Sequence, residues 1–157
     1  MNVRSTANDE IWQSFSIRLA SVLARLPAWT SIALEASGNR FVQFLMADAG
    51  LACEVVCNDY LEQNHRMSLA DETLLHLMGW GTPQHGHNWT RFLDWPARTA
   101  AYRDLSGHVV TALRDVLHIS EPAELTLTGW PGEPDQAPDL TALGINIATT
   151  SEPHNGP

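Results

Sequence analysis

Lysine is absent from the sequence, and all nine basic residues are arginines, against eighteen aspartates and glutamates, which gives a formal net charge of −9. The arginines are scattered singly, whereas phosphate binding needs clustered basic side chains. Nucleic acid is therefore not an expected partner, and the negative charge favours solubility and basic partners. The complete lack of lysine indicates the codon usage of a high-GC bacterium.

Long apolar runs are also missing, since none approaches the roughly 20 residues that span a bilayer. Near the N-terminus, Asp9 and Glu10 come before any stretch that could be the apolar core of a signal peptide. The sequence therefore predicts a cytoplasmic protein that does not contact a membrane. The chain has 157 residues, 44% of them hydrophobic, which is enough for one domain with a substantial core.

Motifs for catalysis are lacking as well, with no Gly-x-Ser-x-Gly elbow and no glycine-rich phosphate loop. There are two cysteines, Cys53 and Cys57, in a segment whose valines favour a strand. On a strand this spacing separates them by roughly 13 Å, too far for a disulfide, so both are expected to be small core residues. The sequence predicts a protein without catalytic residues or a cofactor.

The first half of the chain has clear periodicity. Apolar residues at three- and four-residue steps predict a helix that Asn8 or Asp9 caps and Pro27 ends; they are Ile11, Phe15, Leu19, Val22 and Leu26. Three apolar runs follow, at 30–37, 40–48 and 51–58. Gly-Asn separates the first two runs and Ala-Gly the last two, which predicts an antiparallel meander of three strands.

The second half begins with a capping box, Ser68 with Asp71, which predicts a short helix that ends at Gly79. A second long helix is expected to start at Asp94, with Pro96 in its first turn, and to reach Leu117. A last strand is predicted from Ala123 to Thr128. Together these elements predict a single α+β domain over residues 1–130, in which the meander and the later strand form a sheet against two long helices. Residues 131–157, rich in proline and acidic, are expected to form a flexible C-terminal tail.

The segment 77–96 contains three tryptophans and is predicted to be a loop between the helices. Trp80 and Trp95 are expected to pack on the core, whereas Trp89, among polar neighbours, is the candidate for an exposed binding aromatic. His85 and His87 are two apart and could bind zinc if a third ligand such as Asp94 or His65 lies nearby. The alternative hypothesis is therefore a metal-binding protein or metal-dependent enzyme; otherwise these histidines belong to a solvated loop.

The predicted second strand is apolar on both faces. Phe41, Gln43 and Leu45 share one face, and Val42, Phe44 and Met46 share the other. Because two helices cover only part of a sheet, one apolar face is expected to be only partly covered and left for a partner. That partner would be a protein client or a second copy of the chain. The alternative is that both faces belong to the core. The candidate partner-binding residues are Phe44, Met46, Trp89 and Phe92.

Several phrases in the second half resemble a known family. They are "HLMGWGTP", "HNWTRFLDWP" and "LRDVLHISEPAELTL", with Gly79, Trp80, Pro83, Asn88 and Trp89 as the sharpest positions. From about residue 12 to 127 the chain is similar to the type III secretion chaperone-like, or TY-Chap, domains of actinobacteria, which are related to the YbjN proteins. The resemblance implies an α+β chaperone-like fold, often a homodimer or a protein-binding module, without an established enzymatic activity.

One departure from the family pattern is expected. Secretion chaperones of this class usually have further strands between their last two helices, whereas here the tryptophan-rich loop occupies that part of the sequence. The usual dimer interface and client groove are therefore not carried over, and no client-binding residue is assigned from the resemblance.

Overall fold

A computed structural model describes residues 6–84, 86–130 and 140–148, and these form three α-helices and one six-stranded sheet. The helices are α1 (Thr6–Ala24), α2 (Leu69–Leu77) and α3 (Thr99–Thr111). The strands are β1 (Ser31–Ala36), β2 (Arg40–Ala47), β3 (Gly50–Val55), β4 (Trp89–Asp94), β5 (Thr126–Trp130) and β6 (Asn146–Ile147). The predicted α+β class is confirmed.

The sheet has the strand order β4-β3-β2-β1-β5-β6, and every pairing is antiparallel except the last. The predicted meander is confirmed as β1, β2 and β3. Between β1 and β2, Gly38 and Asn39 both have positive φ, 78° and 61°, as a tight turn between twisted antiparallel strands requires.

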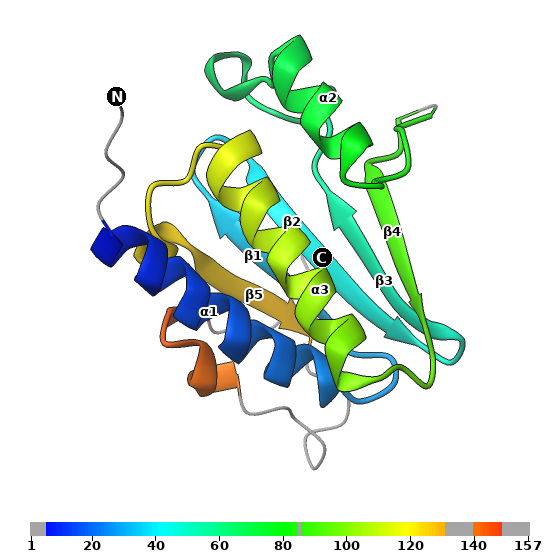
Figure 1. The fold of residues 1–157 in the computed structure, drawn as a ribbon. Coiled ribbons are helices and arrows are strands. Elements are labelled where there is room, and N and C mark those ends of the chain that lie inside the picture. The colour runs from blue at the N-terminus through cyan, green and yellow to red at the C-terminus, as the bar shows by residue number, and fades with distance from the viewer. Residues whose placement is uncertain (1–5, 85, 131–139, 149–157) are drawn as a thin grey trace, which may run out of the picture.

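Helices α1 and α3 lie side by side across one face of the sheet, as Figure 1 shows. Their apolar faces and the inward side chains of the strands form one core. In α1, Trp12 packs edge-on against Phe15 with 5.9 Å between ring centroids, and both are fully buried. We call this side of the sheet the helix-covered face; its strand residues include Ile32, Leu34, Val42, Phe44, Met46, Leu51, Cys53, Val55 and Leu127.

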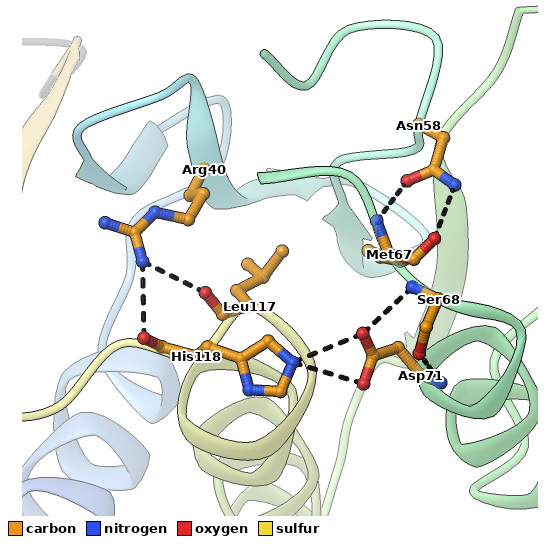
Figure 2. A network of polar contacts seen from close by, with 7 residues as sticks. All are labelled: Arg40, Asn58, Met67, Ser68, Asp71, Leu117 and His118. Atoms are coloured by element: carbon orange, nitrogen blue, oxygen red, sulfur yellow. Dashed lines mark hydrogen bonds and ion pairs between the residues drawn. The ribbon is translucent and has the colours of Figure 1, made fainter. Parts of the chain in front are cut away.

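Helix α2 lies beyond the ends of the strands (Figure 1) and is fastened by polar contacts. Its predicted capping box is confirmed, because Ser68 and Asp71 bond each other's backbone N–H groups. Asp71 also meets His118 Nε2 at 3.2 Å, and Arg40 Nη1 donates to the carbonyls of Leu117 and His118 (Figure 2). These contacts join α2 to the start of β2 and to the segment that follows α3, beyond its π-helical turn Ala112–Val116.

Several predicted boundaries are wrong. The segment expected to be a tryptophan-rich loop contains β4, so a strand does lie between the last two helices, where the family pattern has strands. Asp94 does not cap the following helix, because it is the last residue of β4 and lies opposite Gly50. Helix α3 begins at Thr99, after the cis peptide bond Trp95–Pro96, and has no side-chain cap at Arg98. Helix α1 begins at Thr6, before the expected caps.

The C-terminal part differs from the expected flexible tail. The short helix Leu140–Leu143 packs against α1, and the Leu143 side chain is fully buried. Strand β6 then pairs with β5 in parallel. The apolar residues of this segment explain its attachment, since burying Leu143 removes apolar surface from water. The rest of the predicted tail, 131–139 and 149–157, lies outside the described residues. The last strand, predicted at Ala123–Thr128, begins instead at Thr126, because a turn of 3-10 helix occupies Pro122–Glu124.

Within the described ranges, no helix combines the length and the apolar character that crossing a membrane requires.

Candidate binding site on the open sheet face and its free edge

The sheet has a second face that none of the described helices covers (Figure 1). We call it the open face. Its side chains alternate along each strand with those of the helix-covered face, as the pleat of a β-strand requires. They belong to Ser31, Ala33, Glu35, Phe41, Gln43, Leu45, Ala52, Glu54, Thr90, Phe92, Asp94, Thr126 and Thr128.

An apolar row crosses the open face at one level of the sheet. Phe92 of β4, Ala52 of β3 and Leu45 of β2 lie directly opposite one another in the strand register. Phe92 is 52% exposed and Leu45 is 40% exposed. The ring of Phe92 extends over Gly50, where a Cβ atom would come within 3.0 Å of its Cε1. The apolar row, Phe92–Ala52–Leu45, is therefore on the surface, and the small residues Ala52 and Gly50 leave its larger side chains accessible.

Strand β4 forms one edge of the sheet. At its start, Gly81 and Thr90 exchange two backbone hydrogen bonds, which closes the edge at that point. In an antiparallel strand the backbone groups of alternate residues point to opposite sides. The backbone N–H and C=O groups of Thr90 point away from β3, so those of Phe92 and Asp94 point the same way. No described residue forms a hydrogen bond with these groups of Phe92 and Asp94. The edge from Phe92 to Asp94 is therefore free to pair with another strand.

The charged side chains of the described strands divide by sign between the two faces. Glu35, Glu54 and Asp94 lie on the open face, and Glu54 Oε2 accepts a hydrogen bond of 2.6 Å from Gln43 Nε2. The arginines lie on the other side. Arg40 donates to Ser37 O over 2.8 Å, and Arg91 donates to Met78 O over 2.7 Å beneath the Trp80 ring. The charged side chains that the described strands place on the open face are therefore all carboxylates.

Two hollows lie at opposite ends of β4. The first, about 270 Å³, is next to the start of β4, and the second, about 240 Å³, is next to its end. The first is lined by Asn39, Phe41, Glu54, Tyr60, Gly86, His87 and Asn88. The second is lined by Leu26, Ala28, Met46, Ala47, Asp48 and Trp95. Each hollow thus has one carboxylate, beside the rings of Phe41 and Tyr60 in the first and the ring of Trp95 in the second.

Of the four predicted partner-binding residues, Phe92 is on the open face and exposed. The expected exposure of Trp89 is wrong: its side chain is 3% exposed, and its Nε1 has no hydrogen-bond partner among the described residues. Trp89 is buried because it begins β4 with its side chain on the helix-covered face, opposite Val55. Phe44 and Met46 are 1% and 4% exposed for the same reason, since α1 and α3 cover their face of β2.

The other two tryptophans of the segment have different surroundings. Trp80 is 2% exposed, so its predicted packing on the core is confirmed. Trp95 is 57% exposed, so its predicted packing is wrong. It follows the last residue of β4, where its N–H donates to Ala49 O and its side chain lines the second hollow.

Both cysteines are buried and free, as small core residues would be. Burial raises the pKa of the Cys53 thiol well above its usual value, more than the nearby Arg91 lowers it. The thiol of Cys53 therefore remains neutral around pH 7 and is a poor nucleophile.

His87 is exposed and His85 lies outside the described residues, so the predicted histidine pair cannot be placed as a pair. Around the described part of the chain, no group of three or more His, Cys, Asp or Glu side chains could hold a metal ion. His65, one of the suggested third ligands, lies instead against Gly38. Asp94, the other, is on the open face.

Sequence reasoning missed Leu45 and the free edge of β4. The alternation of side chains along β2 assigned its residues correctly to the two faces of the sheet. Both faces were apolar, however, and nothing in the sequence indicated which face the helices cover. For β4 a signal was present, because Trp, Thr and Phe favour strands and the run Trp89–Leu93 contains all three.

The fold and this surface define a class of protein: a two-layer α+β domain whose mostly antiparallel sheet has helices on one face and an open face on the other. Within that class the family is shown by the sequence. The model of the family described as T3SS (YopN, CesT) and YbjN peptide-binding chaperone 3, TY-Chap3, matches residues 5–131, and the chain belongs to this family. No curated protein and no solved structure matches the chain. The resemblance to TY-Chap and YbjN-related domains is confirmed, whereas the expected actinobacterial source stays a prediction.

Proposed function

We propose that the protein is a chaperone-like module that holds an extended peptide segment of a client protein at the free edge of β4. The family description supports a peptide as the partner. The observation that carries the proposal is that two features lie together. The outward backbone N–H and C=O groups of Phe92 and Asp94 adjoin the exposed side chains of Phe92 and Leu45.

An extended peptide can satisfy both features at once. Its backbone pairs with the outward groups of β4 and extends the sheet by one strand, a recurring mode of peptide recognition. Every second side chain of that strand then lies on the open face, beside the apolar row Phe92–Ala52–Leu45. The backbone bonds give affinity without regard to sequence, and the apolar row selects an apolar side chain. Because the free edge is short, we expect affinities on the order of micromolar.

Fluorescence anisotropy with labelled peptides tests the proposal, once a peptide library has supplied ligands of the full chain. Phe92→Ala is expected to weaken binding at least about tenfold, because an exposed aromatic at the centre of a small interface contributes more than about 1 kcal/mol. The matched control is Ile11→Ala. The exposed fraction of Ile11, 47%, is close to the 52% of Phe92, but Ile11 lies on α1 and not on the sheet. If the two variants bind peptides equally well, the peptide does not lie on the apolar row.

The role of the backbone is tested separately by Phe92→Pro. Proline removes the outward N–H of residue 92 while leaving the bonds between β4 and β3 in place, and proline is tolerated at such edge positions. We therefore expect Phe92→Pro to bind more weakly than Phe92→Ala. Thermal unfolding of both variants establishes that each is folded, and equal binding by the two would exclude pairing at the edge.

Light scattering across a dilution series distinguishes a client from a second copy of the chain. A dimer of the wild type that Phe92→Pro dissociates would mean that the same edge joins two protomers. We expect the oligomeric state to be the same in both proteins.

A further inference from the structure

We infer that the client segment is basic: an apolar side chain with an arginine or lysine two positions before and two positions after it. The inference rests on the proposed function, because it assumes an extended peptide at the β4 edge. It concerns the chemical class of that peptide, and the charges of the open face carry it.

The rows on both sides of the apolar row contain carboxylates. Asp94 lies in the neighbouring row at one side, together with Gly50 and Ala47. Glu54 lies in the row at the other side, between Thr90 and Gln43. In an extended peptide the side chains on one face recur every second residue. A side chain over the apolar row thus has one neighbour, two positions away, beside Asp94 and another, two positions away in the opposite direction, on the side of Glu54. Because Gly81 already pairs with Thr90, this second neighbour lies where the peptide leaves the edge, and a long side chain is needed to reach Glu54 from there.

Both carboxylates are within reach of a long cationic side chain. A strand added to β4 lies about 4.8 Å from it and about 10 Å from β3. Asp94 is on β4 itself, and Glu54 is on β3. The stems of lysine and arginine can cross apolar surface while their charged ends reach a carboxylate. The distance to Glu54 favours these two side chains over short polar ones.

The hollows at the ends of β4 fit the same class of peptide. Asp48 and the exposed ring of Trp95 line the hollow next to Asp94. A guanidinium or ammonium group there could contact the carboxylate and the face of the indole ring together, and such cation–π contacts are attractive. At the other end, Glu54 lines its hollow together with Tyr60.

Cations from the protein's own strands do not neutralise these carboxylates. Arg40 and Arg91 point to the helix-covered face, where their guanidinium groups donate to backbone carbonyls. A second copy of this chain is consequently a poor occupant, because it would bring the same acidic face and the same net charge of −9. An acidic client would be repelled by Glu54, Asp94 and the net charge of −9.

Three matched peptides test the inference, with one apolar residue at the centre and arginine, glutamine or glutamate two positions to each side. We expect the arginine peptide to bind at least about tenfold more tightly than the glutamine peptide at low salt. The glutamate peptide is expected to bind most weakly. The preference should shrink as the salt concentration rises to about 0.5 M, because exposed charges are then screened.

The double variant Glu54→Gln, Asp94→Asn assigns the preference to these two carboxylates. It is expected to bind the arginine and glutamine peptides with nearly equal affinity. The control Glu10→Gln, Asp104→Asn changes the net charge equally but at exposed helix positions, and it should keep the preference. If both double variants lose the preference to the same extent, the net charge rather than the open face selects the peptide, and the assignment is overturned.

The inference and the proposed function fail in different ways. Equal binding of the three peptides, with Phe92→Ala still weakening all of them, would overturn the basic preference and leave the binding edge intact. Binding that Phe92→Ala does not affect would instead overturn the proposed edge.

Discussion

The two faces of the sheet are similar in sequence and opposite in environment. On β2, Phe44 is 1% exposed and its neighbour Leu45 is 40% exposed, although both are large and apolar. Phe44 is on the helix-covered face and Leu45 is on the open face, and α1 and α3 lie across the first of these faces (Figure 1). An apolar side chain on a strand thus indicates burial only when another element covers its face, and an uncovered one indicates a surface available to a partner.

The faces also differ in how they treat charge. The arginines of the helix-covered face donate hydrogen bonds to backbone carbonyls, and Arg40 is only 6% exposed. Among the open-face carboxylates, Glu54 accepts one hydrogen bond from Gln43, and its second oxygen has no hydrogen-bond partner among the described residues. The first arrangement stabilises the fold, whereas the second leaves negative charge for a ligand. This difference between the faces can be tested with paired substitutions.

The largest effect on stability is expected from the pair Phe44→Ala and Leu45→Ala. Phe44→Ala opens a cavity in the core and should lower the free energy of unfolding by about 3–5 kcal/mol. Leu45→Ala removes a side chain that is already partly in water and should cost less than about 1 kcal/mol. Urea denaturation measures both. Similar losses for the two variants would mean that the open face is covered in solution.

A smaller effect is expected from the pair Arg40→Met and Glu35→Gln. Arg40→Met keeps most of the side-chain volume but leaves the carbonyls of Ser37 and Leu117 without their donor. We expect a loss of about 2 kcal/mol. Glu35 is half-buried on the open face, and its neutralisation should change stability by no more than about 0.5 kcal/mol. The comparison breaks down if Glu35→Gln is the more destabilising of the two in thermal or urea unfolding.

The smallest effect is expected at His108 on α3. Burial first, and the nearby Arg91 second, lower the pKa of His108 from its ordinary value of 6.5, against the opposing effect of Asp104. His108 therefore binds a proton more readily in the unfolded chain than in the folded one. Its contribution to the free energy of unfolding is complete above about pH 6.5 and decreases as the pH falls below that value. His108→Gln should flatten this part of the pH profile of unfolding. An unchanged slope would contradict the stated environment of His108.

Local signals in the sequence were sufficient for much of the fold. Gly38 and Asn39 predicted the turn between β1 and β2, and Ser68 with Asp71 predicted the start of α2, because each depends on neighbours in the chain. Strand β4 was missed because Pro83, Gly86 and Asn88 precede it and indicate a loop. Its pairing with β3 joins residues about 40 positions apart, which local patterns do not report.

The site could be predicted only in part for a related reason. The alternation of β2 identified two apolar faces, but the choice between them depends on where α1 and α3 pack, which is a contact between distant segments. The prediction therefore included Phe44 and Met46, from the covered face, and omitted Leu45. Trp89 was predicted as exposed from its polar neighbours in sequence, whereas the pleat of β4 turns its side chain inward. Phe92, on the other side of that pleat, is exposed.

The central claim is that a peptide pairs with the outward groups of β4, and amide hydrogen exchange followed by NMR tests it most directly. The N–H groups of Phe92 and Asp94 have no partner among the described residues, whereas those of Arg91 and Leu93 point to β3. Saturating arginine peptide should slow exchange at Phe92 and Asp94 and leave α1 unchanged, because a new hydrogen bond protects the amide that makes it. Unchanged exchange at Phe92 and Asp94, with the peptide demonstrably bound, would contradict the account.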